Sequence, residues 1–313
     1  MKQVVVVLFL SGALAWAAET LRLESSLDAM GSVYSVVIYS DDRERMEAGV
    51  EEAFEEVRRL DRMLSNYRPE SEWSRVNRFA AERPVKVPAE LFDLLAACLE
   101  YSRRSEGAFD ITVGPLMKVW GFYKGKGRLP EASEVRGALE RVGYRNLILD
   151  RAEATVRFAR PGVEIDPGGI GKGYTVDRMA AVLRERGLTT ALISAGGSSI
   201  YAMGRPPGND PVEGDGWKVD IRNPRDETQV AAQVVLKNES MSTSGSYEKF
   251  FRAGGRLYTH IMDPRTGYPA SGVDSVSVIA PRAFDSEAWT KPFFIQGREW
   301  SARNRPAGFS VFL

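Results

Sequence analysis

The stretch DPGGIGKGY, residues 166–174, surrounds one lysine with four glycines. The spacing of these glycines can be compared with the known nucleotide-binding motifs, and the comparison decides which nucleotide-binding folds are possible for this chain. Glycines let a ligand approach the backbone, and the free N–H groups that open a helix attract anions. Lys172 adds a positive charge at that point. The stretch therefore indicates an anion site, and a plain strand-to-helix turn with a solvated lysine is the alternative.

Neither of the two standard nucleotide loops matches this stretch. A Walker A loop, G-x-x-x-x-G-K-[ST], requires a glycine where the chain has Asp166 and a hydroxyl residue where it has Gly173. A dinucleotide fingerprint, G-x-G-x-x-G, read from Gly169 places its third glycine on Tyr174. The anion site is therefore neither a P-loop nor a Rossmann turn.

The segments around the stretch mix helix and strand patterns without a regular βαβ order. Apolar residues recur every three or four positions in 41–64 and 88–105, and helices are also expected over 132–141 and 176–186. Strands are expected over 33–40, 163–165, 191–193, 217–221, 230–236 and 276–280, with a hairpin formed by 146–149 and 155–158. This mixture favours an α+β fold over a doubly wound parallel sheet.

The N-terminus has the plan of a secretory signal peptide. One lysine precedes the apolar run 4–10, small residues follow, and Ala-Trp-Ala at 15–17 supplies an A-x-A cleavage site. The run is too short for a transmembrane span. We expect a signal peptide over 1–17, a single domain over 18–313, and export to the periplasm or cell envelope; a buried N-terminal strand is the alternative.

Composition excludes several classes of protein. Lys plus Arg and Asp plus Glu each number 42, so no basic field attracts nucleic acid and no nucleic-acid partner is expected. The one cysteine, Cys98, rules out an internal disulfide, and it is not at the cleavage site, so no lipobox cysteine is present. Cys98 lies on an apolar helical face and is expected in the core. With a single histidine, His260, a His/Cys zinc site is not predicted.

Taken together, several segments resemble the ApbE-like family of FAD:protein FMN transferases. They are DAMGS (28–32), LSNYRPESEWSRVN (64–77), GAFDITVGPL (107–116), IDPGGIGKGYTVD (165–177), STSGSYEKF (242–250) and HIMDPRTGYP (260–269). Any one of them is a weak signal, but their order along nearly the whole mature chain is a strong one. The resemblance implies an α+β fold related to the T-fold, with a mixed or antiparallel sheet flanked by helices and FAD in a deep cleft.

The resemblance also implies an activity. Such an enzyme transfers the FMN half of FAD to a Thr or Ser hydroxyl of a partner protein and releases AMP, with Mg²⁺ assisting. The expected acceptor carries a D-x-x-[ST]-G-A-T type motif and is a membrane-associated redox subunit. Two alternatives remain open: an FAD pyrophosphatase that produces FMN and AMP, and a non-catalytic flavin-binding protein.

Site residues follow from the resemblance position by position. Those expected to contact the flavin, adenosine or phosphates of FAD are Met30, Tyr67, Ala108, Phe109, Asp110, Asp166, Lys172, Ser244 and His260. The carbonyl of Gly169 is expected as a metal ligand. His260 is the expected catalytic residue, because histidine exchanges protons near neutral pH; a carboxylate is the alternative base.

The resemblance breaks in SEAWTKPFFIQG (286–297), where the family has a second metal element of the form D-A-x-x-T. Counting back from Gly297 puts Glu287 at the aspartate position and Lys291 at the threonine position. Glu287 can ligate Mg²⁺ through oxygen, but a protonated ammonium group cannot. Thr290 and Asp285 are alternative oxygen donors, and a surface i,i+4 ion pair between Glu287 and Lys291 is the non-functional alternative.

Overall fold

The computed structural model describes residues 20–123, 125–208 and 214–313, so the predicted signal peptide lies outside the described residues. The centre of the fold is a seven-stranded sheet in the order β1-β2-β6-β7-β10-β13-β14. Every neighbouring pair in it is antiparallel. The strands are β1 Leu21–Ala29, β2 Ser32–Ser40, β6 Thr190–Ala195, β7 Ser199–Met203, β10 Glu239–Gly245, β13 Ser275–Ala280 and β14 Ser310–Phe312. The α+β prediction is confirmed.

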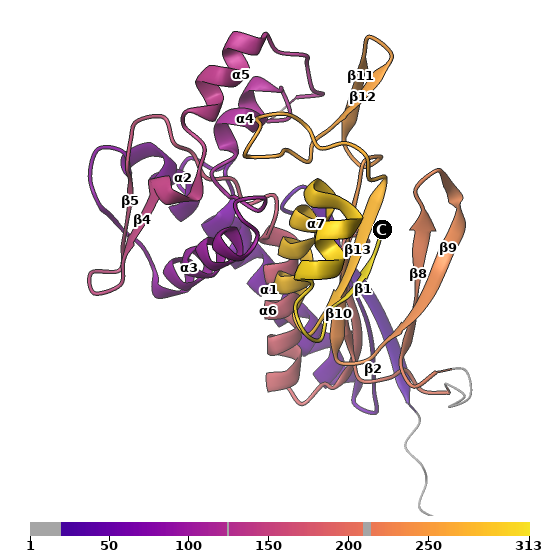
Figure 1. The fold of residues 1–313 in the computed structure, drawn as a ribbon. Helices are drawn as coiled ribbons and strands as arrows, with labels where there is room; N and C mark the ends of the chain where they lie inside the picture. Colours follow the sequence, from indigo (N-terminus) through magenta and orange to yellow (C-terminus); the bar gives the residue numbers. More distant parts are fainter. Residues whose placement is uncertain (1–19, 124, 209–213) are drawn as a thin grey trace, which may run out of the picture.

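Three long helices cover one face of this sheet (Figure 1). They are α1 Arg43–Leu64, α6 Gly171–Glu185 and α7 Ala283–Asn304. Alternate residues of β2 (Tyr34, Val36 and Ile38) are fully buried against α1 and α6, as the period of two in a strand requires. The opposite face is partly covered by a hairpin of β8 Trp217–Asn223 and β9 Asp226–Leu236.

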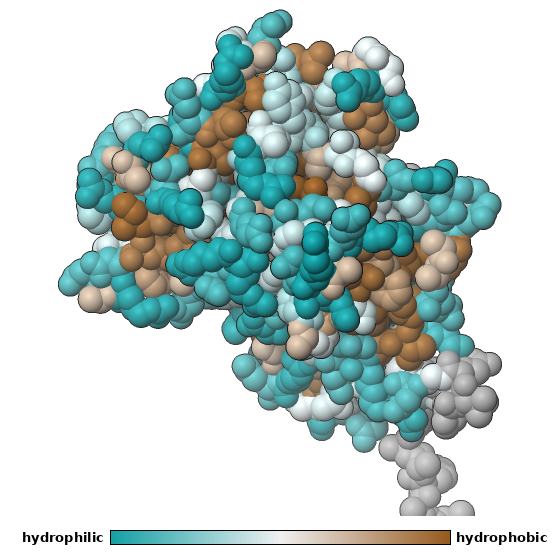
Figure 2. Space-filling model, in the orientation of Figure 1, coloured by the Kyte–Doolittle hydropathy of each residue, from teal (hydrophilic) through white to brown (hydrophobic). Residues whose placement is uncertain are grey.

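The remaining elements pack beside the sheet and beyond the end of it where α6 begins and the site lies (Figure 1). They are α2 Glu72–Phe79, β3 Val85–Lys86, α3 Ala89–Arg104, α4 Gly114–Val119, α5 Ala132–Leu139, a 3-10 turn Tyr144–Asn146, β4 Leu147–Asp150, β5 Thr155–Phe158, β11 Phe250–Ala253 and β12 Arg256–Thr259. Cys98 on α3 is fully buried in the main apolar cluster, as predicted. In the view of Figure 2, polar side chains cover most of the surface and apolar ones gather in smaller areas between them.

Some expected boundaries are corrected. The strand predicted over 163–165 is wrong, because Glu164 forms only a single isolated bridge with Val113. Helix α6 begins at Gly171, five residues before the predicted start at 176, so residues 171–174 of the glycine-lysine stretch form its first turn. None of the helices in the described ranges combines the length and apolar character needed to cross a membrane.

Candidate functional site

A cleft opens where α6 begins, beside the second and third turns of α7 and the β11–β12 hairpin, and it has two parts. The inner part has a volume of about 800 Å³ and the outer part about 1140 Å³. They share Met117, Asp166, Gly168, Lys172, Glu248 and His260, so they form one continuous cleft.

The cleft brings together most of the residues expected to bind FAD. The inner part is lined by Ala108, Phe109, Asp110, Asp166, Gly169, Lys172, Ser244, His260, Glu287 and Lys291, and the outer part by Met30, Tyr67, Asp166, Lys172 and His260. These residues come from segments more than two hundred positions apart in the sequence. Thr290 and Asp285 do not line either part.

The glycine-lysine stretch forms the turn that leads into α6. The carboxylate of Asp166 accepts hydrogen bonds from the Gly168 backbone N–H at 2.8 Å and from Nδ2 of Asn66 at 2.9 Å. Lys172 is partly buried, lines both parts of the cleft, and donates from Nζ to the Ser198 hydroxyl. Because Lys172 is held inside the cleft, the alternative of a turn with a solvated lysine is wrong.

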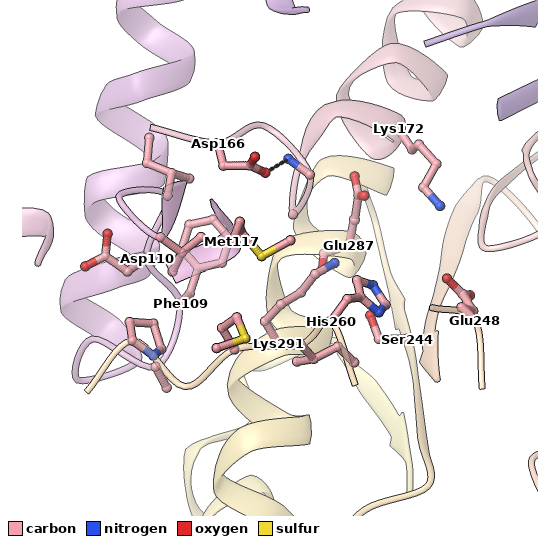
Figure 3. A pocket seen from close by; sticks show the side chains of 18 of the residues that line it. Phe109, Asp110, Met117, Asp166, Lys172, Ser244, Glu248, His260, Glu287 and Lys291 are labelled. Carbon is pink, nitrogen blue, oxygen red and sulfur yellow. Dashed lines mark hydrogen bonds between the residues drawn. The ribbon is translucent and has the colours of Figure 1, made fainter. Parts of the chain in front are cut away.

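The GAFDITVGPL segment forms an apolar wall of the inner part. Ala108 and Phe109 are buried, and the carboxyl group of Asp110 accepts hydrogen bonds from the Thr112 backbone N–H at 2.7 Å and hydroxyl at 2.6 Å. Burial raises the pKa of Asp110 to about 6, against the lowering effect of these hydrogen bonds. Figure 3 shows the Asp110 carboxylate pointing away from Lys291 and His260.

The only histidine follows β12 and enters the cleft in a defined tautomer. Both the backbone N–H and Nδ1 of His260 bond the carbonyl of Lys249, at 3.0 and 3.1 Å. Because a carbonyl only accepts, Nδ1 carries the proton and Nε2 keeps its lone pair. Burial lowers the pKa of His260 to about 4, and the nearby charges of Lys291 and Lys172 contribute to the lowering. The imidazole is therefore neutral near neutral pH and able to accept a proton.

Helix α7 contributes Glu287 and Lys291 to the inner part. Glu287 is 3% exposed, and its Oε2 accepts a 2.6 Å hydrogen bond from the Gly173 backbone N–H on α6. Lys291 extends across the cleft, where a Cβ on Gly169 would lie 3.6 Å from its Cε, and its Nζ donates to the Glu287 carbonyl at 3.1 Å. Figure 3 shows Glu287, Lys291 and His260 directed into the same space. The alternative of a surface ion pair is wrong.

The two alternative oxygen donors, Thr290 and Asp285, are bonded to other partners. The Thr290 hydroxyl donates to the Glu287 carbonyl at 2.7 Å and lies 2.8 Å from the hydroxyl of Ser244. Asp285 binds Tyr101 and Arg282 on the other side of α7. Neither side chain can replace a lost metal ligand without leaving these partners.

The donor set does not suit Mg²⁺. Within the described ranges, no group of three His, Cys, Asp or Glu residues could hold a metal ion. The inner part is lined by the carboxylates of Glu287, Asp166 and Glu248 and by Gly169, but Lys291 and Lys172 line the same space. Mg²⁺ takes only oxygen ligands in near-octahedral geometry, and a neighbouring ammonium group repels it.

Several lining residues were not predicted. Asn66, Met117, Tyr123, Ser198 and Glu248 all line the cleft. Asn66 lies inside the segment 64–77 and Met117 directly follows the segment 107–116, and both segments carry the family resemblance. The sequence could therefore have indicated these two residues. The stacking of Tyr123 on Tyr67, with ring centroids 5.1 Å apart, had no such signal, because the two are far apart in the sequence.

Comparisons with known proteins identify the family. The family model described as the ApbE family matches residues 30–308. An FAD:protein FMN transferase of Treponema pallidum is 34% identical over 298 residues, which span 91% of this chain and 82% of that protein. One from Klebsiella pneumoniae is 32% identical over 274 residues, covering 86% of this chain and 81% of that protein.

Solved structures of ApbE proteins are similar to this chain in fold. The ApbE protein of Thermotoga maritima superposes with a TM-score of 0.83 at 30% identity, covering 93% of both chains. The flavinyl transferase ApbE of Pseudomonas stutzeri superposes with a TM-score of 0.80 at 29% identity, covering 94% of both chains.

Proposed function

The chain belongs to the ApbE family, and from that membership we propose that it is a transferase that moves FMN from FAD to an acceptor protein. The observation that carries the proposal is the continuous cleft, in which the α6 turn, Lys172 and a neutral His260 converge. The inner and outer parts together provide room for a dinucleotide and leave an opening for the acceptor.

The reaction makes one P–O bond and breaks another. The hydroxyl oxygen of an acceptor Thr or Ser attacks the phosphorus on the FMN side of the pyrophosphate. The bond from that phosphorus to the bridging oxygen breaks, and AMP leaves with the oxygen. The hydroxyl proton passes to Nε2 of His260, whose lone pair is free because Nδ1 is bonded to Lys249.

The protein contributes mainly position and charge, as phosphoryl transfer requires. The ammonium group of Lys172, in the first turn of α6, lines the cleft and can stabilise an anionic pyrophosphate there. The buried Phe109 wall and the Tyr67–Tyr123 stack offer aromatic surfaces for the flavin and adenine rings. Mg²⁺ is not included in this proposal, because the donor set does not suit it.

The partner and the location belong to the same proposal. The N-terminal pattern over 1–17 supports export, so the acceptor is expected to be a periplasmic or envelope-exposed segment. We propose a D-x-x-[ST]-G-A-T type motif on a membrane-associated redox subunit. Residues 18–313 act as one domain in this proposal, supported by one sheet that includes both β1 and β14.

The test is an in vitro transfer reaction. The mature protein is incubated with FAD and a domain that carries the acceptor motif, and then covalent flavin fluorescence in a denaturing gel and released AMP are measured. A domain with the acceptor Thr replaced by Val is the matched control. Covalent flavin on the intact motif alone supports the transferase. AMP with free FMN and no labelling identifies an FAD pyrophosphatase, and tight FAD binding without either product identifies a flavin-binding protein.

A further inference from the structure

Two ammonium groups enter the inner part of the cleft from different helices. Lys172 reaches it from α6 and donates to the Ser198 hydroxyl, and Lys291 reaches it from α7 and donates to the Glu287 carbonyl. Both acceptors are neutral oxygens, so neither hydrogen bond neutralises a charge. In the part of the chain that the structure describes, no ion pair joins either ammonium group to a carboxylate. Both ammonium groups are therefore available to an anionic ligand, in a space that Asp166, Glu248 and Glu287 also line.

Two of the carboxylates that line the cleft, Glu287 and Asp166, accept hydrogen bonds from the chain. Oε2 of Glu287 accepts from the Gly173 N–H at 2.6 Å, and Asp166 accepts from Asn66 and Gly168. These bonds orient each carboxylate towards α6 or the turn before it. They leave few oxygen donors for a divalent cation, and the ammonium group of Lys291 already lies beside Gly169.

The burial of Lys291 is costly without an anion nearby. Burial lowers the pKa of this group and Lys172 adds to the lowering, whereas Glu287 and Glu248 act in the opposite direction. A buried charge is stabilised when an opposite charge pairs with it. The pyrophosphate of a dinucleotide in the same cleft is such a partner, and it has room for charge-assisted hydrogen bonds from both lysines.

We propose that the ammonium group of Lys291 supplies the positive charge on the FAD pyrophosphate that a divalent metal would otherwise supply, so that this chain binds FAD and transfers FMN without Mg²⁺. This inference rests on the proposed function. No bond to Lys291 forms or breaks in the reaction. Its charge stabilises the negative charge that moves onto the bridging oxygen as AMP leaves.

Three variants separate the charge of Lys291 from its other properties. Lys291→Met removes the charge and keeps a long, unbranched side chain. Lys291→Thr removes the charge, shortens the side chain and adds a hydroxyl oxygen. Lys86→Met removes one charge from an exposed position on β3 that lines neither part of the cleft, and it is the matched control. The affinity for FAD is measured by quenching of flavin fluorescence, once with EDTA and once with excess MgCl₂.

We expect the wild-type protein and Lys86→Met to bind FAD equally well under both conditions. Lys291→Met should bind FAD about tenfold to a hundredfold more weakly in EDTA, the size expected for a lost charged hydrogen bond. Lys291→Thr should also be weak in EDTA and should recover with MgCl₂. Wild-type affinity that rises tenfold or more with MgCl₂, or a Lys291→Met variant that binds like the wild type, would overturn the inference.

A second measurement, of metal binding, uses the wild-type protein alone and does not depend on catalysis. Mn²⁺ is titrated into the wild-type protein saturated with FAD, and bound metal is counted by electron paramagnetic resonance. Mn²⁺ bound no more tightly than to free FAD supports the inference, and one tightly bound ion per chain overturns it. Failure of FAD to bind under any condition would contradict the proposed function itself, so the two failures are distinguishable.

Discussion

The backbone N–H of Gly173 donates a 2.6 Å hydrogen bond to the carboxylate of Glu287, which joins α6 to α7 beside the inner part of the cleft. The helices approach closely because residue 173 has no side chain: a Cβ there would lie 2.2 Å from the Ala283 carbonyl oxygen. Asp177, one turn further along α6, accepts from the N–H groups of Ala283 and Phe284 that open α7. The position of α7, and with it of Lys291, therefore depends on backbone contacts with α6.

Gly173→Ala should destabilise the protein and disturb the cleft. The added methyl cannot be accommodated without moving one helix, and overpacking of this kind costs about 1–3 kcal/mol. Gly137→Ala is the control, because residue 137 is also helical and a Cβ there meets nothing within 4 Å. It should stabilise by up to about 1 kcal/mol through helix propensity. Equal midpoints of urea unfolding for the two variants would show that the helix contact is not tight.

Asp177→Ala should lower stability by about 0.5–2 kcal/mol, because it removes the side chain that accepts from the N–H groups of Ala283 and Phe284 at the start of α7. Asp177→Asn keeps one acceptor oxygen and should lose less. Both losses can be measured as free energies of unfolding in urea.

The same side chain predicts a dependence of stability on pH. Burial raises the pKa of Asp177 from 3.8 to about 6, so between these values the folded chain binds more protons than the unfolded chain. The contribution of Asp177 is therefore fully present below about pH 4 and is lost as the pH rises through 6. Asp177→Asn should remove this part of the pH dependence. An unchanged profile in the variant would assign the effect to another group.

The transfer rate should stay high well below the ordinary pKa of histidine. His260 has its pKa lowered from 6.5 to about 4, so Nε2 remains an unprotonated base over that interval. We expect the acid limb of the single-turnover rate to have its midpoint nearer 4 than 6.5. His260→Gln should reduce the rate and remove this limb. A midpoint at the ordinary histidine value would contradict the buried, neutral imidazole.

Tyr67→Ala should weaken FAD binding more than it slows transfer. Tyr67 is 53% exposed and stacks on Tyr123 at an interplanar angle of 11°, in the outer part of the cleft. Loss of one aromatic contact costs about 0.5–1.5 kcal/mol, which corresponds to roughly a two- to tenfold rise in KM for FAD. Phe312→Ala, at a half-exposed position on β14, is the control and should leave KM unchanged. A fall in kcat alone would indicate a different role for Tyr67.

Lys172→Met and Ser198→Ala should differ in their effects although the two side chains are hydrogen-bonded to each other. The first removes a charge and should weaken FAD binding about tenfold or more, whereas the second leaves that charge in place and should have a much smaller effect. Isothermal titration with FAD measures both. Equal losses would mean that the hydrogen bond, and not the charge, supports binding.

The sequence predicted several elements with strong periodic patterns, and it missed others, including β1 and β10. α1 and β2 were expected nearly where they lie, because their apolar residues repeat with the helix or strand period. β10 was missed because its buried face is made of hydroxyls: Ser240 and Ser242 bond Ser286 on α7, and Ser244 bonds Thr290. A buried strand whose polar groups satisfy one another carries no hydrophobic alternation.

By itself, the sequence determined the family and many of the residues that line the cleft, including those of the turn before α6, because short-range steric and chemical requirements keep such segments recognisable. Only the tertiary structure decided how those residues are set. The bond from Asn66 to Asp166 spans 100 positions and that from Gly173 to Glu287 spans 114. The lowered pKa of His260 and the place of Lys291 beside Gly169 also depend on such contacts. Burial and charge act through space, so a departure such as Lys291 acquires its meaning only once the chain has folded.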